Sequence, residues 1–187
     1  MRRALAALAL ALVPAATSGA ALTLDEAAQR EAVRAGERGV TNEGFDAEWH
    51  VKNGAGDTAT VITPFHRLAI AARHAAFSGK PLKPGEPARI LKETKDRLVF
   101  WVELRGAAED FARFYDARLL VADREIKAAF AQNERTAARQ DGGRYVARCV
   151  YGFPTRDVSG RGKATLIVSD GDGRDVSRFT IDLARMR

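Results

Sequence analysis

Residues 97–105 read RLVFWVELR, and residues 144–153 read RYVARCVYGF. In both stretches every second side chain belongs to an apolar row. Successive side chains of a strand point to opposite faces, so this period of two predicts strands with one buried and one solvated face. The same alternation recurs at residues 164–168 and 178–183. The buried face of the first stretch would consist of Leu98, Phe100, Val102 and Leu104.

Turns break these strands at intervals that favour a sandwich of two packed antiparallel sheets. Such folds show about seven short strands with a turn signal roughly every 8–12 residues. Asp-Gly steps mark hairpin turns, because both residues tolerate the backbone that such turns require. The expected hairpins are 88–93 with 97–105 around Thr94-Lys95-Asp96, 111–122 with 125–132 around Asp123-Arg124, and 164–168 with 178–183 around Asp170-Gly171-Asp172-Gly173.

The chain ahead of these strands predicts a first helix over residues 23–38. Thr23 and Glu26 have the spacing of a capping box, in which each side chain satisfies a free backbone amide of the other residue. Its apolar stripe is thin, so the helix is expected to lie lightly on the body. A short hairpin, residues 49–51 with 58–63, follows around Asn53-Gly54.

A second helix is predicted over residues 64–77. Thr63 can cap it, and Pro64 fits the first helical position. Three prolines then predict a stiff connector over residues 80–87, with neither helix nor strand. The buried face of the helix would consist of Phe65, Leu68, Ala69, Ala72 and Ala76.

The last hundred residues resemble immunoglobulin-like domains. The resemblance is carried by the strand end Tyr151-Gly152-Phe153-Pro154 and by the closing hairpin at 163–183. The chain is also similar to exported bacterial proteins of unknown function whose last strand closes in Asp-Leu before a final Arg. The resemblance implies a mainly β fold, an immunoglobulin-like antiparallel sandwich of about seven strands preceded by one or two helices. It implies no activity, because this fold carries many unrelated functions.

One alternative architecture remains open, an α+β fold in which a single antiparallel sheet curls around the helix 64–77. In either case the expected organisation has three parts. Residues 1–20 form a signal peptide, residues 21–87 form a helical region with a short hairpin, and residues 88–187 form the β domain. The β domain is expected to be one folded unit with residues 45–87.

The N-terminus has the three parts of a secretory signal. Met1-Arg2-Arg3 is charged, residues 4–13 are apolar, and Ser18-Gly19-Ala20 offers small residues for cleavage after Ala20. The apolar run is about half of the roughly 20 residues that a membrane-spanning helix needs. The protein is therefore expected to be exported to the periplasm or beyond, with no transmembrane segment after cleavage.

Charge and cysteine content narrow the function classes. The chain has 30 basic and 24 acidic residues, a net charge of +6, and the basic residues are scattered among acids rather than clustered. Nucleic-acid surfaces concentrate positive charge, so no nucleic-acid partner is expected. The single Cys149 cannot form an internal disulfide and lies in an apolar row, which indicates an inert core thiol.

No motif predicts catalysis, a metal or a cofactor. The loop from Asp170 resembles a calcium loop, but Arg174 stands at position five and Asp175 at position six, where a ligand and a glycine belong. His66 and His74 are eight residues apart on the predicted helix, about 12 Å along its axis, which is too far to share one metal. We therefore expect no metal site and no cofactor, and an enzyme is the less favoured class.

Two features indicate a binding surface. His66, Arg67, Arg73 and His74 fall opposite the buried face of the second helix, where they could meet an anionic partner such as a carboxylate or phosphate-bearing envelope component. A solvated helix face is the alternative. Trp101 points away from the apolar row of its strand, so it either packs under the helix, which we expect, or marks an exposed binding face.

These observations predict a non-catalytic binding or structural module of the cell envelope that holds another envelope protein. The alternatives are an accessory protein that binds a ligand or glycan, and a hydrolase with an unrecognised site. A partner module should expose an apolar patch around Trp101 or along a sheet edge. A ligand binder should show a pocket with few polar groups, and an enzyme should show a cleft that gathers His, Asp or Ser.

Overall fold

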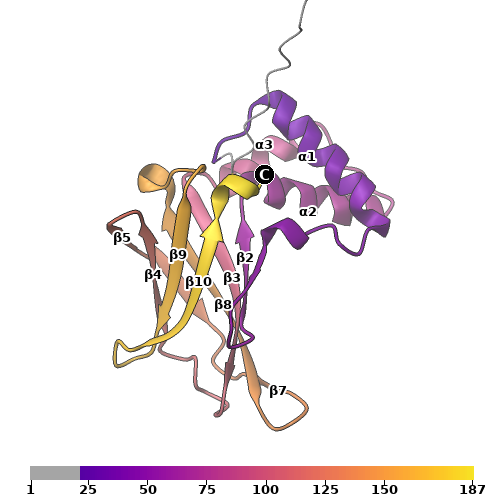
Figure 1. The fold of residues 1–187 in the computed structure, drawn as a ribbon. Coiled ribbons are helices and arrows are strands. Elements are labelled where there is room, and N and C mark those ends of the chain that lie inside the picture. The colour runs from indigo at the N-terminus through magenta and orange to yellow at the C-terminus, as the bar shows by residue number, and fades with distance from the viewer. Residues whose placement is uncertain (1–21) are drawn as a thin grey trace, which may run out of the picture.

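The computed structural model describes residues 22–187, so the predicted signal peptide lies outside the described residues. Two antiparallel sheets face each other, and three helices lie together at one end of the molecule, beside β2 and the C-terminus (Figure 1). The helices are α1 (Glu26–Arg38), α2 (Pro64–Phe77) and α3 (Glu86–Glu93). Short 3₁₀ turns are η1 (Gly39–Thr41), η2 (Ala47–Trp49), η3 (Thr155–Asp157) and η4 (Leu183–Arg185).

The strand order is that of an immunoglobulin-like domain. The core of the larger sheet runs β2-β3-β8-β6 and the smaller sheet runs β10-β9-β4-β5. These orders correspond to strands A-B-E-D and G-F-C-C′ of that fold. The predicted immunoglobulin-like β-sandwich is therefore confirmed. The larger sheet contains β1 (His50–Lys52), β2 (Thr58–Ile62), β3 (Arg97–Gly106), β8 (Tyr145–Pro154), β6 (Phe130–Asn133) and β7 (Ala138–Arg139), and the smaller sheet contains β4 (Asp116–Val121), β5 (Arg124–Lys127), β9 (Lys163–Ser169) and β10 (Asp175–Asp182).

The chain changes sheets within two residues. Ala128 N donates to Ala117 O in the smaller sheet at 3.2 Å, and Ala129 N donates to Gly152 O in the larger sheet at 2.7 Å. The prediction of one strand over residues 125–132 is therefore wrong, because this segment forms β5 in one sheet and β6 in the other. The same crossing rules out the single curled sheet.

Three other predicted boundaries change. Residues 88–93 are not a strand but belong to α3, which begins at Glu86 inside the predicted connector. Pro87 is compatible with the first turn of a helix, where its missing N–H is not needed. Arg89 forms an ion pair with Glu93, four residues later, at 3.2 Å, which also stabilises a helix. The strand expected over residues 111–122 begins only at Asp116.

The helix α2 has its predicted bounds, whereas α1 begins at Glu26 instead of Thr23 and packs closely on α2 instead of lying lightly on the body. The carboxylate of Asp25, rather than Thr23, accepts from Ala28 N at 2.7 Å and begins α1. Thr63 caps α2 as expected and accepts from His66 N at 3.1 Å. The two helices touch at Gly36, where a Cβ atom would lie 2.1 Å from the main-chain oxygen of Ala69.

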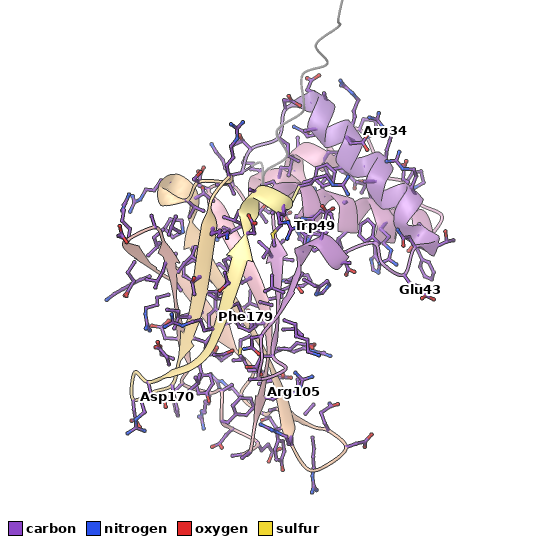
Figure 2. All side chains as sticks on the ribbon, viewed as in Figure 1. Arg34, Glu43, Trp49, Arg105, Asp170 and Phe179 are labelled. Carbon is purple, nitrogen blue, oxygen red and sulfur yellow. The ribbon has the colours of Figure 1, made fainter. Side chains whose placement is uncertain are left out.

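One continuous core joins the helices to both sheets. Its largest fully buried side chains are contributed by η2, α2 and the inward faces of the strands, and Phe100 meets Phe153 edge-on at 5.6 Å between ring centroids. Phe179 points between the sheets, and Trp49 lies where the C-terminal segment meets the helices (Figure 2). The alternating rows predicted from the sequence are these inward faces, including Leu98, Phe100, Val102, Leu104, Cys149, Tyr151 and Phe153.

We predict that Gly36→Ala destabilises the protein by about 1–3 kcal/mol, the usual cost of overpacking. The added methyl group meets the backbone oxygen of Ala69, which cannot rotate away. Urea unfolding measures the effect. Gly54→Ala is the matched control, since an added Cβ there has nothing within 4 Å. Equal stabilities of the two variants would contradict the close packing of α1 on α2.

Candidate functional site

Trp101 stands on the outer face of the larger sheet and remains 44% exposed. The register sets His50 opposite Thr60, Thr60 opposite Trp101, and Trp101 opposite Val150, so these four residues form one row across four strands. The prediction that Trp101 packs in the core is wrong. The helices gather at one end of the sandwich, and α2 reaches only one side of the indole instead of covering this sheet face.

Two cavities meet at Trp101. One, of about 370 Å³, lies over the sheet face, where Thr58, Glu103 and Arg148 form the next row of side chains. The other, of about 440 Å³, lies between Trp101 and the helical end of the molecule and is lined by Arg73 and His74. We call these two adjoining cavities the Trp101 groove.

The structure brings three of the five predicted site residues together. Arg73, His74 and Trp101 line the same cavity, although Trp101 comes from β3 and the other two from α2. Arg67 lies elsewhere and faces Glu93 of α3 at 3.8 Å. The residues that line the groove and were not among the predicted site residues are Val40, Phe45, Asp46, His50, Thr58, Thr60, Ile70, Phe77, Val102, Glu103, Arg148, Cys149 and Val150.

The positive charge of Arg73 in the groove already has partners within the protein. The guanidinium of Arg73 lies 4.9 Å from the ring centroid of Phe45 and also reaches the main-chain oxygen of Asn42 at 3.5 Å. A cation over an aromatic face is held by the ring quadrupole. Phe77, at the end of α2, is 76% exposed at the same cavity. The groove is therefore aromatic with local charges, and it does not present a cluster of unpaired cations.

A carboxylate, an imidazole and a hydroxyl form a chain beside Trp101. Asp46 Oδ2 lies 3.1 Å from His50 Nε2, and His50 Nδ1 lies 3.0 Å from Thr60 Oγ1. Partial burial raises the pKa of the Asp46 carboxyl, but the hydrogen bond and charge of His50 outweigh it, so the net direction is downward. Asp46 is thus held ionised next to an imidazole whose two nitrogens both have partners.

This chain of groups has the order found in hydrolases but not their surroundings. An acyl-transfer site needs free backbone N–H groups aimed at the developing oxyanion. Thr60 lies in the middle of β2, which is paired with β1 on one side and β3 on the other. The backbone amides next to Thr60 therefore form hydrogen bonds within the sheet. The contacts among Asp46, His50 and Thr60 connect the start of η2 to the β1–β2 hairpin.

His66 is not a surface residue, which corrects its predicted place on the wet side of the helix. It is fully buried, and its ring stacks on Trp49 with 4.1 Å between centroids and 6° between planes. The physical reason is that η2 and the C-terminal segment cover this side of α2. Trp49 Nε1 and the hydroxyl of Thr63 both donate to the main-chain oxygen of Arg187, which lies over the same helix.

The environment of His66 favours the neutral imidazole. Nδ1 lies 3.0 Å from the oxygen of Val61, while Nε2 has no hydrogen-bond partner among the described residues. Burial is the main cause that lowers the pKa of His66 from 6.5 to about 4, against the opposing effects of the Val61 hydrogen bond and the Asp46 charge. His66 is a core residue and takes no part in the groove.

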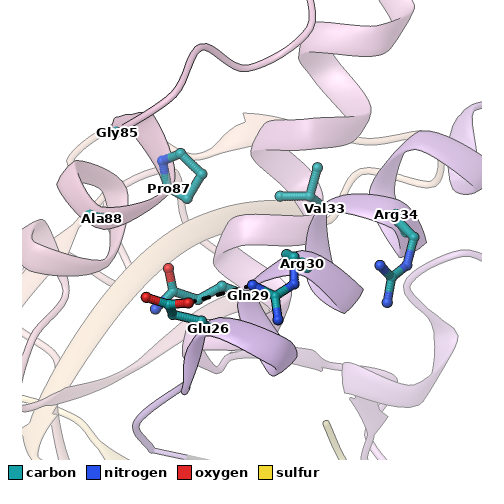
Figure 3. A pocket seen from close by; sticks show the side chains of 8 residues that line it. All are labelled: Glu26, Gln29, Arg30, Val33, Arg34, Gly85, Pro87 and Ala88. Carbon is teal, nitrogen blue, oxygen red and sulfur yellow. Dashed lines mark ion pairs between the residues drawn. The ribbon is translucent and has the colours of Figure 1, made fainter.

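A second hollow lies between α1 and α3 and measures about 440 Å³ (Figure 3). Glu26 and Arg30 form an ion pair at 3.5 Å on its rim, and both side chains are mostly exposed. Val33 and Pro87 supply its apolar wall. Exposed ion pairs of this kind contribute little to stability, and this one offers no specific recognition of a ligand. No exposed aromatic side chain lines this hollow, so we place the candidate site at Trp101.

Other predicted features have structural explanations. Asp170 Oδ1 accepts from the backbone of Asp172 and Arg174 at 3.0 and 2.9 Å, as in a polar hairpin turn. Cys149 is buried, and burial raises the pKa of its thiol. Within residues 22–187, no cluster of three or more His, Cys, Asp or Glu side chains could hold a metal. No helix in this part of the chain is long and apolar enough to cross a bilayer.

No family model matches the sequence, and no curated protein sequence matches it. A solved protein of unknown function from Burkholderia pseudomallei K96243 is similar at 11% identity and a TM-score of 0.44, over 87% of this chain and 91% of that one. The IgNAR antibody domain C3 is similar at 12% identity and a TM-score of 0.33, over 71% of this chain and 96% of that one.

We predict that His66 makes stability depend on pH in the acidic range. Above 6.5 the imidazole is neutral in both states; below 6.5 the unfolded chain takes up a proton that the folded protein binds only near 4. The free energy of unfolding should therefore fall as pH drops through this window, by up to about 3 kcal/mol from this group.

The measurement is urea unfolding of wild type and His66→Gln across this range, with NMR titration of the His66 ring. The pH slope should be shallower in the variant, whatever its absolute stability. An imidazole that titrates near 6.5 in the folded protein would contradict the assignment.

Proposed function

We propose that the protein is an exported, non-catalytic binding module of the cell envelope and that it holds its partner in the Trp101 groove. One observation carries the proposal, the 44% exposure of Trp101 on a sheet face where it lines both cavities. The other tryptophan, Trp49, is fully buried. The charged and apolar leader at residues 1–20 supports export.

An exposed indole at this position suits recognition. Tryptophan is enriched among the residues that dominate binding energy, because it buries a large rigid surface and keeps a polar N–H. Phe77 adds a second exposed ring, while Arg73 and Asp46 supply polar groups in the same cavity. A pocket of a few hundred Å³ with an apolar wall and a few polar groups is typical of binding sites.

We predict that Trp101→Ala abolishes capture of the partner by the tagged mature protein in pull-downs from its own envelope. Loss of a central aromatic residue typically costs at least about 2 kcal/mol, or about thirtyfold in affinity. Phe114→Ala is the matched control, because Phe114 is also an exposed aromatic residue, 73% accessible, at a separate hollow beside β4 and the β9–β10 turn. Equal capture by both variants would contradict the placement of the site.

The Asp46–His50–Thr60 chain favours hydrolase activity as a second candidate function. If it were catalytic, removing the base or the hydroxyl would cost on the order of 10² in rate. We predict instead that His50→Ala and Thr60→Val leave hydrolysis of p-nitrophenyl acetate at the wild-type level. A hundredfold loss in both variants, with unchanged circular dichroism, would support the hydrolase and contradict the non-catalytic module.

A further inference from the structure

We infer that the Trp101 groove binds a neutral glycan chain, with one sugar ring lying on the indole of Trp101 and the hydroxyls of the chain bonded by the side chains of the neighbouring strands. The inference rests on the proposed function, since it names the ligand of the same groove. It differs from that proposal in its chemistry and can fail separately.

Trp101 forms a flanked platform. Its strand, β3, is paired with β2 on one side and β8 on the other, so the ring rises between Thr60 and Val150 in one row of the register. The C–H groups on a sugar face carry small positive charges, and they are attracted to the electron-rich face of an aromatic ring. An exposed indole on a sheet face suits such a flat, weakly polarised surface.

The side chains around the platform combine donors and acceptors. Thr58, Glu103 and Arg148 share the next row, and Glu103 Oε1 lies 3.4 Å from Arg148 Nε. A hydroxyl donates and accepts, a carboxylate only accepts, and a guanidinium only donates. Each sugar hydroxyl can both donate and accept a hydrogen bond. Side chains that include both donors and acceptors therefore match a sugar better than a ligand that only donates or only accepts.

The charges of the groove are balanced. Asp46 lies against His50, Glu103 lies against Arg148, and Arg73 lies over the ring of Phe45. A site for phosphate or carboxylate would need a surplus of positive donors. The centre of a protein–protein interface is depleted in acidic residues, whereas here the half-exposed carboxylate of Glu103 stands one row from the indole. Both comparisons favour an uncharged, hydroxyl-rich ligand.

The dimensions favour a chain over a single sugar. The cavities of about 370 and 440 Å³ meet at Trp101, so a ligand that crosses the indole enters both. The second cavity offers the exposed ring of Phe77. A linear oligosaccharide can place successive rings along this path, and the inference predicts that affinity rises with chain length.

The test uses the full mature chain and three neutral hexasaccharides, namely β-1,4-linked N-acetylglucosamine, β-1,4-linked glucose and α-1,4-linked glucose. The protein has two tryptophans, of which Trp49 is fully buried and Trp101 is 44% exposed. Acrylamide quenching of fluorescence therefore reports on Trp101. We expect at least one hexasaccharide to protect this fluorescence and to bind more tightly than its disaccharide by calorimetry.

Substitutions test whether the measured sugar binding depends on the indole of Trp101. Trp101→Ala should lower the affinity at least tenfold, Trp101→Phe should lower it less because a ring remains, and Phe114→Ala should leave it unchanged. Arg148→Ala, at an 80% exposed side chain, should weaken binding severalfold and serves if Trp101→Ala does not fold. Thermal unfolding and circular dichroism verify each fold.

Two results would overturn the inference. One is the absence of binding by all three hexasaccharides, and the other is binding that Trp101→Ala or Arg148→Ala leaves unchanged. If the envelope pull-down then recovers a protein that depends on Trp101, the glycan is wrong and the proposed binding module stands. If neither sugar nor protein depends on Trp101, the proposed function fails as well.

Discussion

The pairing of β3 with β8 is the constraint on which the rest of the structure depends. Each strand has 10 residues, and the ladder runs without a shift from Arg97 opposite Pro154 to Gly106 opposite Tyr145. Because side chains alternate, this register sends Phe100 and its neighbours inward and Trp101 outward. A shift of the register by one residue would bury Trp101 and expose Phe100. The whole apolar row of the strand would then face solvent, so this shift is strongly disfavoured. The core and the outer groove are therefore two consequences of one pairing.

The C-terminal segment and η2 determine how much of the outer face stays open. Trp49 stacks on His66 and donates to the main-chain oxygen of Arg187, whose guanidinium also pairs with Glu48 at 2.6 Å. These contacts hold η2 against α2, and η2 begins after Asp46, which lines the groove. The helices are thereby held beside Trp101 rather than over it, which leaves the indole exposed on one side and enclosed on the other.

The sequence predicts the parts of this fold in which a local pattern and the tertiary structure agree. Alternation identified β3, β8, β9 and β10, and the Thr63 cap identified α2. The prediction failed at α3, because a run of only six residues fits both the helical period of 3.6 and the strand period of two. It also failed at residues 125–132, because a strand that passes from one sheet to the other keeps the same alternation. Burial of His66 could not be predicted, because the side of α2 it faces is covered by residues distant in the chain.

The candidate site was predictable only in part for the same reason. Trp101 stood out as a large aromatic residue opposite an apolar row, and Arg73 and His74 as polar residues on one helix face. Their meeting depends on how α2 docks against β3, and the contributions of Asp46 and Phe45 depend on η2. No local spacing encodes that arrangement. The function proposed for the groove accordingly follows from side chains that the three-dimensional structure brings together.

The register of β3 on β8 is tested most directly by nuclear Overhauser contacts between the two backbones in the labelled protein. The structure predicts cross-strand contacts that join Trp101 with Val150 and Val102 with Cys149. Contacts that join Trp101 with Cys149 instead would reveal a register shifted by one residue. Trp101 would then face the core, and the groove described above would not exist.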